Sequence, residues 1–283
     1  MTQLGVVGGG TMGAGIAEIA IRAGDEVLVL ERDQSAADAA RGRIEKSLSR
    51  AVKKAKITED EAERSLANLR LTTSLSDFGD RELVIEALPE IEDLKVGFFA
   101  DLDKVTSPEA ILATNTSSIP IIRIAKDVAD PSRVVGVHFF NPVPVMPLVE
   151  IISSLASSPH AIETVTAYAR DHLGKRTIQA GDRGGFVVNA LLIPYLVSAI
   201  RMYESGYASK EDIDAGMVNG CAHPMGPLTL SDTVGLDVVL DVSESLYHEF
   251  REPHLAPPPL LQRMVEAGYL GKKTGRGFYD YSE

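Results

Sequence analysis

Short, almost uninterrupted apolar runs recur along the first part of the chain and are separated by segments with helical spacing. The runs lie at residues 4–7, 26–30, 82–88, 110–115 and 133–139. Helical spacing follows the first run from Thr11, and it returns at residues 34–54 and again after Thr58, a residue suited to cap a helix. Apolar strands that alternate with helices are typical of a parallel sheet covered on both faces.

The pattern changes after "GDRGGF" at residues 181–186. Beyond this point no convincing alternating strand is found, and helical segments cover residues 187–206, 209–220, 235–250 and 258–267. The apolar residues 186–202 must be buried on most faces, against their own domain or a second copy. We therefore predict an α/β domain over residues 1–184 and an all-α domain over residues 185–283.

One stretch, "GVHFFNPVPVMPLVE" at residues 136–150, ends an apolar run with a histidine and begins another that contains a glutamate. Its prolines favour extended or turn backbone, so the chain is expected to leave a strand at His138 and to re-enter one near Leu148. On this pattern alone, His138 and Glu150 are either buried polar groups satisfied by backbone or a functional pair.

Composition excludes several classes of protein. The chain has 283 residues, 45% of them hydrophobic and 24% charged, which is typical of a globular protein with a sizeable core. A net charge of −12 argues against general binding to nucleic acid or to an anionic membrane. The single cysteine, Cys221, cannot form an internal disulfide and lies in no metal-binding pattern. We see no signal peptide or membrane span and expect a cytoplasmic protein.

A glycine-rich turn near the N-terminus is the most specific local motif. Gly8, Gly10 and Gly13 fit G-x-G-x-x-G between a predicted strand and a predicted helix. In this context the first glycine permits a tight turn, the second lets a pyrophosphate approach, and the third lets helix and strand pack closely. The helix N-terminus then offers N–H groups to the anion. The motif predicts a dinucleotide site.

The residue expected to bind the cofactor's ribose is Glu31, which follows the second strand at the spacing of about 20 residues that this motif requires. A carboxylate accepts a hydrogen bond from the 2′-hydroxyl of NAD and repels the 2′-phosphate of NADP. The adjacent Arg32 can soften that repulsion. We predict a preference for NAD.

A basic stripe runs along the predicted helix at residues 34–54. Its four cations share one face, at positions 46, 50, 53 and 54, and Ser47 lies beside them. The stripe is either a solvated helix face or a binding site for an anionic ligand.

With these residues placed, the whole chain resembles the L-3-hydroxyacyl-CoA dehydrogenase family, most closely its bacterial 3-hydroxybutyryl-CoA dehydrogenases. The resemblance rests on separated motifs: "GGGTMGAGIA", "LVIEA", "ATNTSSIPI", "HFFNPVPVMPLVE", "GFVVNALLIPYL", "HPMGP" and "GKKTGRGFYDY". It implies a Rossmann domain followed by a helical domain that builds a homodimer, and NAD-dependent oxidation of a short-chain (S)-3-hydroxyacyl-CoA. No metal is implied.

The resemblance also implies site residues. The family's catalytic positions fall on His138, Glu150, Ser117 and Asn189. Its NAD contacts fall on Gly8, Gly10, Thr11, Met12, Gly13, Glu31, Glu90, Lys95, Ser117, Asn141 and Lys273, and its CoA contacts on Ser47 and Lys54.

Two segments depart from the family's pattern. The domain junction carries Gly184 and Gly185 where the family often has "TPGF", which could loosen a hinge. Pro89, in "LPEIEDLK", is unusual and puts the transfer of Glu90 and Lys95 in doubt.

The chemistry suits these residue types. Imidazole gains and loses a proton near neutral pH, so His138 can serve as general base, and a carboxylate on its other ring nitrogen fixes the tautomer.

Some alternatives stay open on the sequence. Ser117 can instead be a simple turn serine and Asn189 a core amide. Other open readings are an acyl-carrier-protein substrate, a free sugar acid, or a dinucleotide-binding protein without catalysis.

Overall fold

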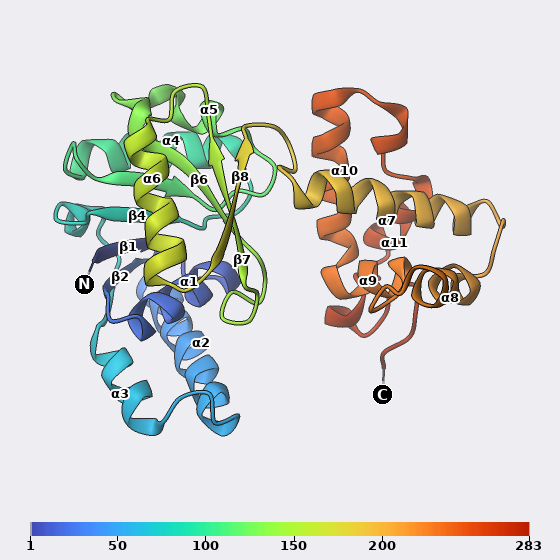
Figure 1. The fold of residues 1–283 in the computed structure, drawn as a ribbon, viewed down its shortest axis with the longest axis horizontal. Coiled ribbons are helices and arrows are strands. Elements are labelled where there is room, and N and C mark those ends of the chain that lie inside the picture. The colour runs from blue at the N-terminus through green and yellow to red at the C-terminus, as the bar shows by residue number, and fades with distance from the viewer. Residues whose placement is uncertain (1, 283) are drawn as a thin grey trace. The chain divides into compact units, whose positions relative to one another are not determined.

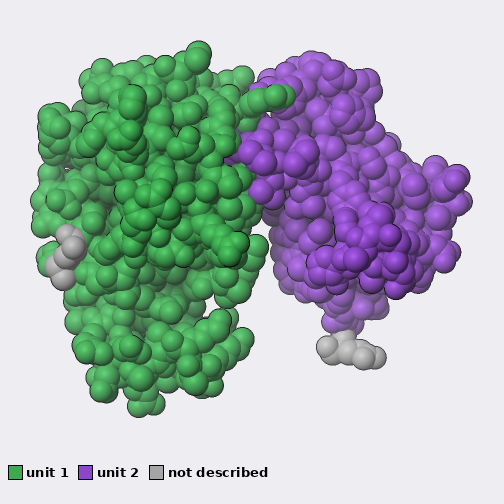
Figure 2. All heavy atoms as spheres, in the orientation of Figure 1, with its two compact units in different colours: residues 1–183 green, residues 184–283 purple. Residues whose placement is uncertain are grey.

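The computed structural model describes residues 2–282, and the chain divides into two compact units, residues 1–183 and residues 184–283 (Figure 2). Unit 1 is built on an eight-stranded, mostly parallel sheet with helices, and unit 2 is helical (Figure 1). The predicted fold class is confirmed. In the part of the chain that is described, no helix is both long and apolar enough to cross a membrane.

The sheet of unit 1 has the strand order β3-β2-β1-β4-β5-β6-β7-β8. Its strands are β1 (Gln3–Val7), β2 (Glu26–Leu30), β3 (Leu69–Thr72), β4 (Leu83–Glu86), β5 (Ile111–Thr114), β6 (Val134–Phe139), β7 (Leu148–Ser153) and β8 (Arg176–Gly181). The order reverses direction between β1 and β4, and such a reversal opens a ligand-binding crevice at the carboxyl ends of the strands.

One pairing departs from the expected parallel sheet. β6 and β7 are antiparallel because only the short proline-rich loop joins them, and a parallel connection would need a much longer crossover. Consequently the end of β6 lies beside the start of β7, and both lie at the same edge as the ends of β1, β4 and β5.

Helices cover both faces of this sheet. They are α1 (Thr11–Arg22), α2 (Gln34–Lys53), α3 (Glu59–Ala67), α4 (Glu92–Val105), α5 (Ile121–Ile124) and α6 (Pro159–Ala167), with the short turns η1 (Leu75–Phe78), η2 (Ala125–Asp127) and η3 (Pro131–Arg133) and the π-helical η4 (Tyr168–His172). Ile16 of α1 and Ile44 of α2 share one buried core with alternate strand residues such as Val6, Ile85 and Val137. This alternation explains the near-continuous apolar runs, since the central strands β1, β4, β5 and β6 are buried on both faces.

Polar caps fix where several helices begin. Thr58 accepts a hydrogen bond from the Glu61 backbone N–H, and the Glu61 side chain accepts one from the Thr58 backbone, as a capping box requires. Asp33 caps α2 in a similar way through Ala36. Asp33 thus starts α2 shortly after β2, and Thr58 starts α3 after the turn that ends α2.

Unit 2 packs its helices around its own apolar core. They are α7 (Val188–Glu204), α8 (Lys210–Cys221), α9 (Pro227–Val234), α10 (Leu236–Phe250) and α11 (Pro259–Glu266), with η5 (Pro253–Leu255) and η6 (Lys272–Thr274). Leu196 and Ile200 of α7 are buried against Val239 and Leu246 of α10. The opposite side of α7 is less covered within the chain, and Leu191 is 73% exposed.

Candidate active site

The glycine loop joins β1 to α1 and has the local geometry that a pyrophosphate site requires. Gly8 has φ +85°, a conformation that favours glycine. A Cβ on Gly13 would lie 1.7 Å from the Gly8 carbonyl oxygen, so only glycine fits. Gly10, the N-cap of α1, has no side chain to bond the first helical N–H groups. These groups are therefore suited to an anion, and the residues fit a dinucleotide.

Glu31 lies immediately after β2 and is held against this loop. Its Oε1 accepts a hydrogen bond from the Gly9 backbone N–H at 2.7 Å. Arg43 of α2 donates to the Gly9 carbonyl oxygen at 3.2 Å, a contact that the sequence did not predict. The side chain of Arg32 pairs with Asp33 at 3.1 Å, which directs its charge toward that carboxylate. Glu31 thus lies beside the glycine loop, directly after the end of β2.

His138 and Glu150 come together across the antiparallel pair of strands. The register of β6 and β7 sets the two residues opposite each other, and His138 Nδ1 lies 2.7 Å from Glu150 Oε2. Both side chains are buried, at 7% and 0% exposure. The Phe140 ring lies against the imidazole, with centroids 4.6 Å apart. A carboxylate that accepts from Nδ1 fixes the tautomer and leaves proton transfer to Nε2.

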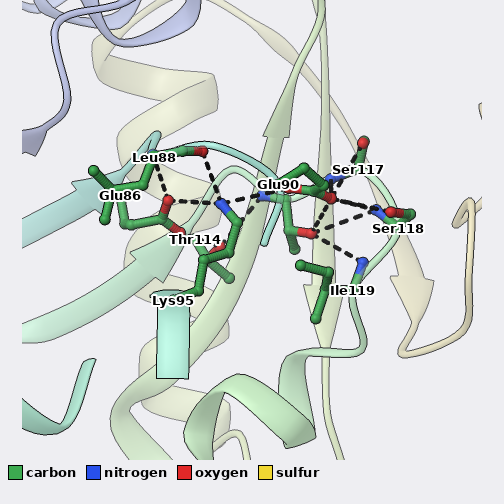
Figure 3. Close-up of polar contacts among 9 residues, drawn as sticks. Glu86, Leu88, Glu90, Lys95, Thr114, Ser117, Ser118 and Ile119 are labelled. Carbon is green, nitrogen blue, oxygen red and sulfur yellow. Dashed lines mark hydrogen bonds and ion pairs between the residues drawn. The ribbon is translucent and has the colours of Figure 1, made fainter. Parts of the chain in front are cut away.

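Ser117 lies beyond the end of β5, in a turn organised by Glu90 (Figure 3). Glu90 Oε1 accepts hydrogen bonds from the backbone N–H groups of Ser117 and Ser118, at 2.8 Å and 3.0 Å, and from the Thr116 hydroxyl at 2.6 Å. The Ser117 hydroxyl lies 3.3 Å from the same oxygen. Burial acts to raise the pKa of Glu90, but the Lys95 ammonium and these donors outweigh it and lower that pKa below its usual value.

Lys95 connects Glu90 to a second carboxylate that the sequence did not single out. Its ammonium lies 3.4 Å from Glu90 Oε2 and 2.6 Å from Oε1 of Glu86, the last residue of β4. Pro89 therefore does not separate Glu90 from Lys95, and the structure brings both into one network. The signal for Glu86 was present in the sequence, since it is an ionisable residue inside the apolar run "LVIEA".

The proline-rich loop after His138 carries Asn141, which is exposed. The loop is held by Lys175, whose ammonium donates to the carbonyl oxygens of Val143 and Met146 at 2.6 Å and 2.8 Å. Burial lowers the pKa of this lysine. Lys175 was also missed, because its contacts are to backbone atoms about 30 residues away in sequence, which no local pattern reveals.

A cavity of about 320 Å³ lies between α1, α2 and this proline-rich loop. Thr11, Ser47 and Asn141 line it together with Arg43 and Arg50. The structure thus brings two predicted cofactor contacts and one predicted CoA contact around a single opening.

The basic stripe forms on the surface of α2 as the spacing predicts. Its cations at positions 46, 50, 53 and 54 are exposed, and Lys54 is the C-cap residue of the helix. Positive side chains near a helix C-terminus also interact favourably with the helix dipole.

Two predicted site residues belong to unit 2. Asn189 is the second residue of α7 and is half-buried. Lys273 lies in η6, and its ammonium pairs with the carboxylate of Asp237 in the first turn of α10. At the junction, the Gly184 N–H donates to Glu249 at 2.8 Å, so the first of the two consecutive glycines is tied to α10.

Comparison with known proteins gives a consistent result. Residues 3–183 match the family described as 3-hydroxyacyl-CoA dehydrogenase, NAD binding domain, and residues 185–281 match 3-hydroxyacyl-CoA dehydrogenase, C-terminal domain. The chain is 55% identical over 280 residues to a 3-hydroxybutyryl-CoA dehydrogenase of Mycobacterium tuberculosis, covering 99% of this chain and 98% of the relative.

Solved structures agree over the full length. The crystal structure of M. tuberculosis FadB2 has a TM-score of 0.98 at 54% identity and covers 100% of this chain and 99% of its own. That of (S)-3-hydroxybutyryl-CoA dehydrogenase from Ralstonia eutropha has a TM-score of 0.95 at 43% identity, with 100% of both chains covered. The chain therefore belongs to the 3-hydroxyacyl-CoA dehydrogenase family.

Proposed function

We propose that this protein oxidises (S)-3-hydroxybutyryl-CoA to the 3-keto thioester with NAD as the electron acceptor. The observation that carries the proposal is the buried His138–Glu150 pair at the edge of the sheet where the glycine loop also lies. The substrate is inferred from the names of the relatives from M. tuberculosis and R. eutropha.

His138 is the general base in this proposal. Its Nε2 takes the proton of the substrate 3-hydroxyl, while Glu150 holds Nδ1–H and balances the positive charge of the imidazolium. Ser117 orients the same hydroxyl from the turn after β5. Asn189, from the helical domain, is the fourth residue proposed to act in catalysis. In the reverse direction His138 returns the proton to the 3-keto oxygen.

NAD, when bound, supplies the acceptor for the hydride that leaves the substrate carbon. The residues proposed to hold it are those of the glycine loop (Gly8, Gly10, Thr11, Met12 and Gly13), with Glu31 at the adenosine ribose and Glu90, Lys95, Ser117, Asn141 and Lys273 at the nicotinamide side.

Glu31 accounts for the proposed preference for NAD. Its carboxylate would repel a 2′-phosphate, and the neighbouring Arg32 is engaged with Asp33. We expect kcat/KM to be higher with NAD than with NADP. Glu31→Ala should reduce the ratio of the two kcat/KM values. A clear preference for NADP in the unmodified protein would reject this assignment.

Ser47 and Lys54 are proposed to bind the CoA moiety. Ser47 lines the cavity beside the glycine loop, and the exposed cations of the α2 surface offer charge to the phosphates of CoA. The residues 1–184 then form the NAD-binding domain and the residues 185–283 the substrate and dimerisation domain. The exposed Leu191 and Met202 on α7 favour a homodimer through the helical domain.

The test is to follow NADH absorbance with acetoacetyl-CoA, its N-acetylcysteamine thioester and an acetoacetyl acyl carrier protein. We expect turnover with the CoA thioester, and a higher KM for the truncated thioester because it lacks the phosphates. Preference for the carrier-protein form would indicate that the substrate is an acyl-carrier-protein thioester of a biosynthetic pathway. Failure with every thioester would overturn the proposed function.

A further inference from the structure

The buried network next to the Ser117 turn contains a carboxylate, Glu86, to which the proposed function gives no role. Glu86 ends β4 and is 0% exposed, and Lys95 of α4 is 1% exposed. Glu86 Oε1 accepts from the Lys95 ammonium at 2.6 Å and from the Leu88 backbone N–H at 2.5 Å, while Oε2 accepts from the Thr114 hydroxyl at 2.7 Å. Both oxygens of this carboxylate are thus engaged.

The ammonium of Lys95 is surrounded by acceptors in three directions. Besides Glu86, it donates to the Leu88 carbonyl oxygen at 3.2 Å and faces Glu90 Oε2 at 3.4 Å. An ammonium has three protons, so it can donate to these three acceptors at once. Its place is therefore set by the buried Glu86 on one side, and its charge acts on the partly exposed Glu90 on the other (Figure 3).

Glu90 transmits this placement to the turn that carries Ser117. One oxygen of Glu90 holds the turn after β5, and the other faces Lys95. The Glu90 side chain is 34% exposed, and Lys95 is the cation that faces its second oxygen, so misplacing Lys95 weakens the hold on that oxygen. The chain of contacts runs from Glu86 through Lys95 and Glu90 to the backbone of Ser117 and Ser118.

We propose that Glu86 is a positioning residue that, as the buried counter-charge of Lys95, holds Glu90 on the 116–118 turn and so fixes the Ser117 hydroxyl. The inference rests on the proposed function only for the roles of Ser117 and Glu90 at the cofactor. The ordering of the turn is a property of the protein itself.

The test is amide hydrogen exchange at Ser117 and Ser118 in the cofactor-free protein. Glu86→Gln keeps the shape of the side chain but removes the charge that pairs with Lys95. We expect exchange of these two amides to rise about tenfold, because Lys95 loses its buried counter-charge and no longer holds Glu90, their acceptor, firmly on the turn. The matched control is Glu18→Gln, which removes the buried carboxylate that pairs with Arg22 on α1, and it should leave both amides unchanged. Unchanged exchange in Glu86→Gln would overturn the proposal.

A second variant keeps the test available if Glu86→Gln does not fold. Glu86→Gln with Lys95→Met removes both buried charges, and neutral replacements of this kind are often tolerated in protein interiors. Fast exchange at Ser117 and Ser118 is expected there too, since Glu90 has lost its cation. Protected amides in the folded double variant would show that Glu90 holds the turn unaided.

The affinity for NADH supplies a readout that distinguishes positioning from general destabilisation. The Kd for NADH should rise severalfold in Glu90→Gln, and adding Glu86→Gln should change it little further, because the two residues act in series. If the effects of Glu86→Gln and Glu90→Gln on Kd were additive, the proposal that Glu86 acts through Glu90 would be rejected. If no thioester is turned over, the exchange experiment still decides the inference, so the two failures are distinguishable.

Discussion

The His138–Glu150 and His172–Asp25 pairs use the same chemistry in different parts of unit 1. Both join an imidazole to a fully buried carboxylate, at 2.7 Å and 2.8 Å. His138 and Glu150 lie at the edge of the sheet that carries the glycine loop and the Ser117 turn. Asp25 immediately precedes β2, so it lies at the end of the sheet opposite the one that carries the glycine loop. His172 is the last residue of η4.

The partners of each carboxylate explain the contrast. Asp25 accepts hydrogen bonds from the Thr2 backbone N–H and the Tyr168 hydroxyl as well as from His172, each at 2.8 Å. It therefore ties together three segments that are far apart in sequence, which is a structural task. A close histidine–carboxylate contact alone does not indicate catalysis; the position of the pair relative to the ligand-binding edge of the sheet does.

A large loss of kcat is expected from removing the carboxylate charge of the His138–Glu150 pair, and little loss from removing that of the His172–Asp25 pair. Glu150→Gln should lower kcat at least about 100-fold, because the imidazolium of His138 loses its counter-charge and its tautomer is no longer fixed. It should also shift the pH profile of kcat. Asp25→Asn should leave kcat near the unmodified value and lower the melting temperature. Equal losses of kcat in the two variants would contradict the contrast.

A smaller effect on stability is expected from Tyr168→Phe. This change removes one hydrogen bond to the Asp25 carboxylate and should lower the free energy of unfolding by about 2 kcal/mol. Denaturant unfolding measures it, with kcat as the control that should not change.

The same tyrosine gives a pH dependence. Burial, followed by the Asp25 carboxylate, raises the pKa of Tyr168 well above its usual value. A group whose pKa is raised by folding binds its proton more tightly in the folded state. Its contribution to stability is therefore complete below the unfolded pKa of about 10 and is lost as the pH rises beyond it. Tyr168→Phe should lack this alkaline component, and an identical alkaline loss in both proteins would rule out Tyr168 as its source.

The smallest effect is expected at the α2 surface. Lys54→Ala should raise KM for the CoA thioester about threefold at low salt and weaken the salt dependence of KM, because an exposed charge contributes little and is screened. Lys126→Ala, at an exposed lysine of η2, is the control. A salt dependence that Lys54→Ala leaves unchanged would mean that the stripe is only a solvated surface.

Local patterns predict much of this molecule because its central strands are buried on both faces. The glycine loop, the apolar strands and the stretch from His138 to Glu150 are each encoded within about 15 residues, so spacing alone places them. The strand that ends near His138 and the one that begins at Leu148 are confirmed.

What the patterns missed has a physical reason. β3 and β8 are the two edge strands of the sheet, and β8 has no buried residue to give an apolar run. The helix α9 is only 8 residues long and begins at the proline of a Gly-Pro pair. Glu86, Lys95 and Thr114 belong to three different elements, so their convergence depends on strand order, which a single sequence does not reveal.

The most direct test of the central claim is to measure kcat with acetoacetyl-CoA and the Kd for NADH in His138→Gln and His172→Gln. We expect His138→Gln to lower kcat about 1000-fold with NADH binding nearly intact, as loss of a general base requires. His172→Gln should turn over at close to the normal rate. Near-normal turnover in His138→Gln would contradict the assignment of His138 as the base.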